Sequence, residues 1–170
     1  MVSRHTGIDL LPPVNTIWET QMTTFSRRAE LRWDGELMTG NGQVSAGTGT
    51  FAVPVIFPSV SGEPAGKTTP EELLAASHAT CYGIGLRSLI SRRGGHATRI
   101  TVDAMISAEK GPDGIRIESS HLAALVEGLE QLDLVQLQDI AREVAEGCTI
   151  SAALRGSVTI THDVKADLAR

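Results

Sequence analysis

One stretch of the sequence, residues 70–92, limits the possible folds more than any other. Thr69 precedes it as a suitable N-cap, and Pro70 fits the first helical position because its missing N–H would have no helical partner there. Glu72 lies three residues after Thr69, which is the spacing of a capping box. The pattern therefore predicts a helix over 70–92 that ends before Gly94.

The interior of this helix is apolar and contains two glycines. From Leu73 to Leu89 it has no proline and no acidic residue, so we expect it to be buried on most sides. Gly83 and Gly85 each cost about 1 kcal/mol relative to alanine inside a helix. A close approach by a neighbouring helix or strand would explain them. The helix also carries Cys81, one of only two cysteines.

Composition indicates a globular chain and excludes several classes of partner. With 170 residues, of which 41% are hydrophobic, the chain is long enough for one domain with a substantial core. A net charge of −5, no basic block and 4% aromatic residues argue against a nucleic acid partner. No apolar run approaches the roughly 18 residues that cross a membrane, and no secretory signal pattern opens the chain. We therefore expect a cytoplasmic protein, in which a structural disulfide would be uncommon.

The remaining periodicities predict an α+β fold. Residues 1–26 lack periodicity and are expected to form an N-terminal arm, which leaves 27–170 as one domain. The order of strands, helix, strands, helices and strand favours a largely antiparallel sheet over repeated βαβ units. Strands are expected within 27–57, where Asp34-Gly35 predicts a hairpin turn and Pro54 predicts an edge strand. Further strands are expected at 100–106, 115–126 and 157–162, and further helices at 133–146 and 149–154.

The two cysteines are the main candidates for chemistry. Cys81 and Cys148 have neither the spacing of a Cys-x-x-Cys redox motif nor that of metal ligands. Buried cysteines that act as small hydrophobic residues remain an alternative. Cys148 follows Gly147 at an expected helix N-terminus, a location that lowers a thiol pKa. The histidines also lack metal-ligand spacing, so no metal site is predicted.

His78 and Glu71 lie on the same helix as Cys81. His78 precedes Cys81 by three residues and shares its helical face, which permits a hydrolase-like Cys–His pair or simply a packed histidine. Glu71 lies ten residues before Cys81, about 15 Å away along a continuous helix. Glu71 can therefore act on the thiol only by orienting a third group, such as an arginine, while it also stabilises the helix dipole.

Two segments resemble the cysteine motifs of the OsmC/Ohr family. Residues 67–81, with Pro-Glu-Glu-Leu and His-Ala-Thr-Cys, resemble the first-cysteine motif, and residues 146–151, Glu-Gly-Cys-Thr-Ile-Ser, resemble the second. Residues 29–45, with Leu-x-Trp-x-Gly and Gly-x-Gly, resemble the N-terminal strands of the OsmC branch, and His78 also matches that branch. The similarity covers about residues 27–165.

This resemblance implies an OsmC-like fold in an intertwined homodimer, with antiparallel sheets wrapped around long central helices and two active sites at the subunit interface. It implies a thiol peroxidase for organic hydroperoxides, active in oxidative or osmotic stress defence. Cys81 falls on the position of the peroxide-attacking thiol, Cys148 on that of the resolving thiol, and Glu71 on that of a glutamate that holds a catalytic arginine. The resemblance implies no haem, flavin or metal cofactor. It also implies reduction of the disulfide by a dithiol, such as a lipoyl group on a protein.

The chain departs from the family pattern in one respect. The catalytic arginine of the family lies upstream of the first-cysteine motif, but residues 34–70 contain no arginine. Lys67 is near but cannot form the planar fork of a guanidinium, which leaves Arg27, Arg28 and Arg32 as candidates. The missing arginine supports a second hypothesis, a non-catalytic binding protein for a small apolar ligand with an unreactive first thiol.

Overall fold

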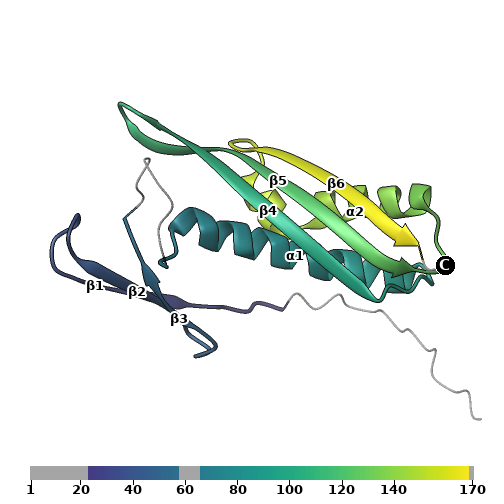
Figure 1. The fold of residues 1–170 in the computed structure, drawn as a ribbon, viewed down its shortest axis with the longest axis horizontal. Coiled ribbons are helices and arrows are strands. Elements are labelled where there is room, and N and C mark those ends of the chain that lie inside the picture. The colour runs from purple at the N-terminus through teal and green to yellow at the C-terminus, as the bar shows by residue number, and fades with distance from the viewer. Residues whose placement is uncertain (1–22, 58–65, 169–170) are drawn as a thin grey trace, which may run out of the picture.

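The computed structural model describes residues 23–57 and 66–168 (Figure 1). Most of the expected arm and part of the connection into the long helix lie outside these residues, so the domain boundary at residue 27 stays a prediction. The described residues form α1 (Pro70–Arg92), α2 (Leu134–Gly147), α3 (Thr149–Leu154), β1 (Ala29–Asp34), β2 (Asn41–Ala46), β3 (Ala52–Val55), β4 (Arg99–Gly111), β5 (Gly114–Leu129) and β6 (Thr159–Leu168).

The long helix α1 begins and ends as its sequence predicts. Thr69 is the N-cap, and its Oγ1 accepts a hydrogen bond from the Glu72 N–H at 3.2 Å. The Glu72 carboxylate accepts a hydrogen bond from the Thr68 hydroxyl at 2.7 Å. The predicted capping box is therefore only half formed, because Glu72 binds a neighbouring hydroxyl instead of the N-cap backbone. Gly94 follows the helix with a φ of +79°, a left-handed conformation that favours glycine.

The core lies between the two longer helices and one face of the second sheet. In Figure 1, α1 runs below the strands β4, β5 and β6, and α2 lies behind them; α1 contacts β4 and α2, and α2 contacts β6. α2 has Asp133 as its N-cap in a full capping box with Gln136. Its buried residues, Leu137, Ile140, Ala141 and Val144, recur at helical spacing and form one apolar face. The fully buried apolar side chains of this core are Tyr82, Leu86, Ile90, Leu122, Val126, Leu137 and Ile140.

The strands form two separate three-stranded sheets. β1, β2 and β3 are antiparallel, and β3 is an edge strand, as Pro54 predicts. Gly35 follows β1 with a φ of +88°. The loop from β1 to β2 runs from Gly35 to Gly40, so it is longer than a two-residue hairpin turn. β4 and β5 form an antiparallel hairpin, whereas β6 pairs with β5 in parallel. The parallel pair departs from an all-antiparallel arrangement because the chain crosses back through α2 and α3 before β6.

The two glycines inside α1 mark close contacts, which confirms the prediction from the sequence. A Cβ placed on Gly83 would lie 3.3 Å from Cγ2 of Val102 on β4. A Cβ placed on Gly85 would lie 2.6 Å from Cγ1 of Val144 on α2. The absent side chains therefore let β4 and α2 approach α1.

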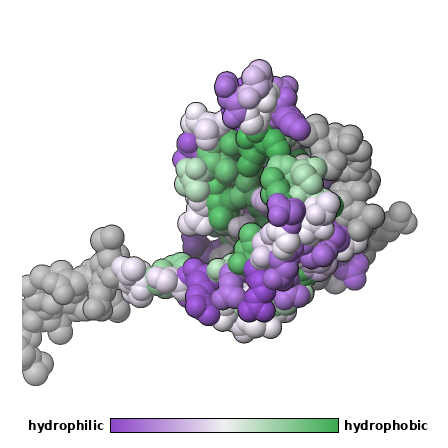
Figure 2. Space-filling view, turned by 90° about the vertical axis from the view of Figure 1, so that its left-hand side faces the viewer, coloured by the Kyte–Doolittle hydropathy of each residue, from purple (hydrophilic) through white to green (hydrophobic). Residues whose placement is uncertain are grey.

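One face of α1 remains uncovered in the single chain, so the expectation of burial on most sides is wrong for this chain alone. Ile84 is 66% exposed although it lies in the middle of the helix. The second sheet and α2 cover only the opposite face, because one chain supplies a single layer against α1. Figure 2 shows apolar side chains gathered in a hollow at the end of the molecule that carries the β4–β5 turn. Within the described residues, no helix is long and apolar enough to span a membrane.

We expect Gly85→Ala to destabilise the fold although alanine is the better helix former. The added methyl group would press on Val144 at 2.6 Å. Overpacking of a core costs about 1–3 kcal/mol, and for so short a contact we expect a cost in the upper part of that range, above the gain of about 1 kcal/mol in helix propensity. Urea unfolding at matched protein concentration measures the effect. Gly83→Ala is the control and should be less destabilising, because its methyl group would lie 3.3 Å from Val102 Cγ2, which a small shift of that side chain can accommodate. If Val144→Ala fails to reduce the cost of Gly85→Ala, the close contact is not its cause.

Candidate active site

The two cysteines meet between α1 and the junction of α2 with α3. Cys81 lies in the middle of α1, and Cys148 is both the C-cap of α2 and the N-cap of α3. Both are free thiols, and Cys148 Sγ donates a hydrogen bond to Cys81 Sγ across 2.7 Å. Cys148 is buried, whereas Cys81 is partly exposed. The fold therefore brings together the two thiols that the sequence places far apart.

The surroundings of Cys81 favour its thiolate. Burial acts to raise the pKa of Cys81, but hydrogen bonds from Cys148, from the Ile150 N–H and from Thr149 together lower it below its ordinary value. Thr149 contributes its N–H and its hydroxyl, whose Oγ1 lies 3.6 Å from Cys81 Sγ. All these donors are uncharged and belong to the start of α3. The partly exposed thiol is thus the one whose thiolate is favoured.

Cys148 has the opposite tendency, which corrects the expectation that its helix N-terminus would lower its pKa. Burial and the hydrogen bond to Cys81 raise the pKa of Cys148, and hydrogen bonds from Ser151 and the Ile150 N–H only partly oppose them. The prediction failed because burial and the hydrogen bond to Cys81 outweigh the N–H donors at the start of α3. The sequence showed that Cys148 lies at the start of the helix, but not how deeply its sulfur would be buried or which sulfur the first N–H groups of the helix would contact.

Cys81 opens onto a groove between α1 and α2 with a volume of about 430 Å³. Its apolar lining includes Ile84, Leu89 and Val144. Arg92, also in the lining, lies three helical turns beyond Cys81, or about 16 Å along the axis. The groove can therefore hold a small, mainly apolar molecule beside the thiol.

His78 does not pair with Cys81, although both lie on α1. Its Nδ1 is hydrogen-bonded to Ser120 Oγ at 2.8 Å and its Nε2 to Ser151 Oγ at 2.9 Å. The ring is fully buried, and burial lowers the pKa of His78, so the imidazole is neutral near pH 7. With both nitrogens occupied, His78 cannot serve as the base of a hydrolase acting through Cys81. The interpretation as a packed histidine is the correct one.

Glu71 lies in the first turn of α1 and is partly buried. It is not among the groups that shift the pKa of Cys81, in agreement with its expected distance along the helix. Its place in the first turn suits the positive end of the helix dipole. A role in holding a catalytic cation stays a prediction.

None of the candidate cations shifts the pKa of the first thiol within the described part of the chain. Arg27 lies over the ring of Phe25 at 5.0 Å, and Lys67 donates a hydrogen bond to Asn41 at 3.3 Å. Arg28 and Arg32 are exposed residues at the first strand. In the single chain, the neutral donors at the start of α3 are therefore what favours the thiolate.

The hydroxyl groups around the thiols were missed by the sequence interpretation. Ser151 follows Cys148 by three residues, the spacing at which an N-cap side chain meets a backbone N–H, and its N–H lies 3.5 Å from Cys148 Sγ. This spacing could have indicated Ser151. No local pattern indicates Ser120, because only the packing of β5 on α1 brings it to His78.

Comparison with known proteins supports the resemblance seen in the sequence. Peroxiredoxin OsmC of Escherichia coli (strain K12) is 26% identical over 142 residues, which cover 84% of this chain and 99% of that protein. The organic hydroperoxide resistance protein OhrB of Bacillus subtilis (strain 168) is 25% identical over 130 residues, 73% of this chain and 89% of that protein. A solved structure of an organic hydroperoxide resistance protein from Elizabethkingia anophelis matches the fold with a TM-score of 0.70 at 23% identity, covering 85% of this chain and 99% of that one. The model of the OsmC-like protein family matches residues 62–163, which include both cysteine motifs and well over half of the sequence, and the chain therefore belongs to the OsmC-like family.

Proposed function

We propose that this chain is a peroxidase for organic hydroperoxides, in which Cys81 attacks the peroxide and Cys148 resolves the oxidised thiol. The observation that carries the proposal is the contact between the two sulfurs, 2.7 Å apart, with Cys148 as donor and Cys81 as acceptor. Opposite pKa shifts at the two thiols support a division of roles between nucleophile and proton donor. Relatives named as a peroxiredoxin and as organic hydroperoxide resistance proteins support the substrate class and a role in stress defence.

The proposed reaction begins at the Cys81 thiolate. Its sulfur attacks one oxygen of the hydroperoxide, the O–O bond breaks, and Cys81 becomes a sulfenic acid as an alkoxide leaves. Cys148 supplies its thiol proton to the alkoxide, which leaves as an alcohol. The Cys148 thiolate then attacks Cys81 Sγ and expels hydroxide, which solvent protonates to water. The peroxide gains two electrons, and the two thiols lose them as the disulfide forms.

The groove beside Cys81 suits an alkyl hydroperoxide better than hydrogen peroxide. Ile84, Leu89 and Val144 offer apolar surface next to the attacking sulfur. Contact with an alkyl group adds binding free energy of about 25 cal/mol for each Å² of apolar surface buried, which hydrogen peroxide cannot gain. The groove is open, so it also leaves access for an external dithiol, such as a lipoyl group, to reduce the disulfide. That requirement for reduction agrees with a cytoplasmic location.

We further propose that the active protein is a homodimer. The uncovered face of α1 around Ile84 and the exposed apolar residues of the first sheet, such as Leu31 (59% exposed), would be covered by a second copy. Figure 2 shows that apolar side chains also gather in a hollow at one end of the molecule. A second copy over α1 would narrow the groove beside Cys81. It is also the arrangement in which Glu71 could hold a cation near the thiol.

A binding protein without catalytic activity is the alternative on the same scaffold. That hypothesis requires an unreactive thiol at Cys81. The lowered pKa of Cys81 favours the peroxidase, because only the thiolate is a strong nucleophile.

We expect Cys81→Ser to abolish the consumption of cumene hydroperoxide, because the attacking sulfur is removed. Cys148→Ser should still consume one equivalent and leave Cys81 as a sulfenic acid that a dimedone-type reagent traps. Peroxide assays and mass spectrometry after one equivalent of peroxide measure both effects, and the unaltered protein should show a Cys81–Cys148 disulfide. An unchanged rate in Cys81→Ser would reject the proposed function.

We expect Thr149→Val to raise the pKa of Cys81 by less than about one unit, because it removes one weak, neutral donor and keeps the side-chain shape. A higher pKa means less thiolate at pH 7, so alkylation of Cys81 should slow a few-fold there and converge with the unaltered protein at high pH. Thr149→Ser retains the hydroxyl and is the matched control. The pH dependence of iodoacetamide alkylation measures both variants in a Cys148→Ser background, and equal profiles would show that the hydroxyl does not act on Cys81.

We expect the protein to sediment as a dimer and Ile84→Asp to shift it towards monomer, because a charge would be buried between the two copies. Val135→Asp is the matched control, since Val135 on α2 is equally exposed at 66% but does not line the groove. Analytical ultracentrifugation over a range of concentrations distinguishes the variants. A monomeric unaltered protein at micromolar concentration would contradict the proposal.

A further inference from the structure

The short helix α3, which follows Cys148, has little apolar contact with the rest of the molecule. It is six residues long, and only Ser151 among them is buried, while Ile150 and Leu154 are half-buried. A helix of this length does not persist on its own, because its first turn is costly to form. Its position therefore depends on contacts with other elements, and the same contacts decide where the Cys148 sulfur lies.

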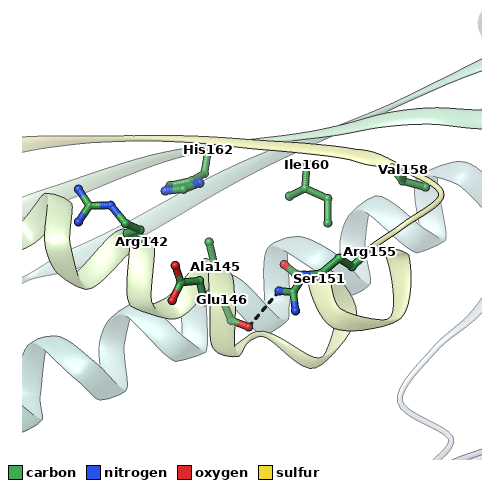
Figure 3. A pocket seen from close by; sticks show the side chains of 8 residues that line it. All are labelled: Arg142, Ala145, Glu146, Ser151, Arg155, Val158, Ile160 and His162. Atoms are coloured by element: carbon green, nitrogen blue, oxygen red, sulfur yellow. Dashed lines mark hydrogen bonds between the residues drawn. The ribbon is translucent and has the colours of Figure 1, made fainter.

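The side of α3 that faces β6 is not close-packed. A pocket of about 300 Å³ lies between α2, α3 and β6, and its lining includes Ser151, Val158 and Ile160 (Figure 3). At its edge Arg155, the C-cap of α3, donates a hydrogen bond to the backbone oxygen of Glu146 at 3.2 Å. That bond is exposed, so water can replace it at little cost. The contacts that hold α3 in place must therefore lie mainly on its other side, towards α1.

On that side a buried polar contact joins α3 to α1. Ser151 Oγ is hydrogen-bonded to His78 Nε2 at 2.9 Å, and His78 Nδ1 is hydrogen-bonded to Ser120 Oγ on β5 at 2.8 Å. His78 and Ser120 are 0% exposed and Ser151 is 1% exposed, so water does not compete for these bonds. A neutral imidazole has one N–H and one acceptor nitrogen, and a serine hydroxyl can donate or accept, so both bonds form in either tautomer.

The contact lies beside the sulfur of Cys148. The Ser151 N–H donates to Cys148 Sγ at 3.5 Å, and Cys148 Sγ donates to Cys81 Sγ at 2.7 Å. A disulfide bond is about 2.05 Å long, so the two sulfurs need to approach by only about 0.7 Å. α3 can therefore stay docked on α1 while the disulfide forms, and a displaced α3 would take Cys148 away from Cys81.

We infer that His78 is a positioning residue whose hydrogen bond to Ser151 docks α3 on α1 and thereby keeps Cys148 buried and in contact with Cys81. For its purpose the inference rests on the proposed two-thiol reaction. In that reaction Cys148, after giving its proton to the alkoxide, forms the S–S bond with the Cys81 sulfenic acid and expels hydroxide, which solvent protonates. His78 exchanges no proton and holds the attacking sulfur within reach.

The first test measures how often α3 opens, without any peroxide. Cys81→Ser leaves Cys148 as the only thiol of the chain, and because it is 4% exposed it reacts with iodoacetamide from the open state. The thiol of that state is solvated alike in every variant, so the alkylation rate follows the opening equilibrium. We expect Ser151→Ala to raise this rate about tenfold, as for the loss of one buried hydrogen bond whose partner stays unpaired. His78→Leu should act in the same direction, and Ser151→Thr, which retains the hydroxyl, should restore the slow rate.

Ser120→Ala is the matched control. It removes the other hydrogen bond of His78, which is equally buried and of nearly the same length, but it does not touch α3. We expect alkylation of Cys148 in this variant to stay within about twofold of the rate with Ser120. Hydrogen exchange gives a second readout, in which Ser151→Ala should speed exchange of the α3 amides about tenfold and Ser120→Ala should not.

The second test follows the reaction in the chain with both cysteines. Rapid mixing with one equivalent of cumene hydroperoxide, followed by trapping of sulfenic acid, gives the rate of Cys81 oxidation and the rate of disulfide closure. We expect Ser151→Ala to slow closure at least twofold and to leave Cys81 oxidation within about twofold, because only closure needs Cys148 in place. Ser151→Thr should restore closure, and Ser120→Ala should leave it unchanged.

An unchanged alkylation rate in Ser151→Ala would overturn the inference. Equal acceleration in Ser120→Ala would also overturn it, because a general loss of core stability predicts that result. Faster alkylation with unchanged closure would show that docking of α3 does not serve the disulfide step, which likewise overturns it. If His78→Leu does not fold, Ser151→Ala decides the matter, since it removes a single oxygen atom. If peroxide fails to oxidise Cys81 in the unaltered protein, the proposed function fails instead, and the alkylation rates still decide whether His78 docks α3.

Discussion

The hydrogen bond from Cys148 Sγ to Cys81 Sγ is the interaction on which the site depends. It makes two chemically identical side chains unequal, since the acceptor sulfur gains a donor and the donor sulfur retains its proton. Burial pushes the pKa of both thiols upward, so the different pKa shifts arise from hydrogen bonding and not from exposure alone. The result is a thiol whose thiolate is favoured in contact with a thiol that donates to it, and no charged group among the described residues contributes to the lowered pKa of Cys81.

This contact requires three elements to meet within a few ångströms. α1 carries Cys81, and the break between α2 and α3 carries Cys148. α2 can approach because Gly85 leaves room for Val144, the same side chain that forms part of the groove wall. Gly85 lowers the helix propensity of α1. It also lets α2 approach α1 closely, which packs the core and brings Cys148 to Cys81.

A group of buried polar side chains is tolerated in the core only when each hydrogen-bonding atom has a partner. His78 meets this condition, because Ser120 and Ser151 occupy both ring nitrogens and leave it neutral. The histidine is thus part of the core and adjacent to the chemistry at the same time. Of the two interpretations that the sequence offered for it, a packed residue or a partner of Cys81, the first is correct, and one of the residues it packs against is Ser151, whose N–H donates to Cys148 Sγ.

Local patterns in the sequence were sufficient for the helices, the cap at Thr69 and the glycine contacts, because capping, periodicity and steric room depend on neighbours along the chain. Motif resemblance was sufficient to pair Cys81 with Cys148 as candidates. The sequence could not show which thiol is more acidic, since that depends on where the first N–H groups of α3 point after packing on α1. It also could not show Ser120 beside His78, because that contact joins a strand and a helix that no local pattern relates. Interactions between neighbours along the chain thus determined the helices and strands, whereas the acidity of the thiols was decided by burial and hydrogen-bond donors that only tertiary packing brings about.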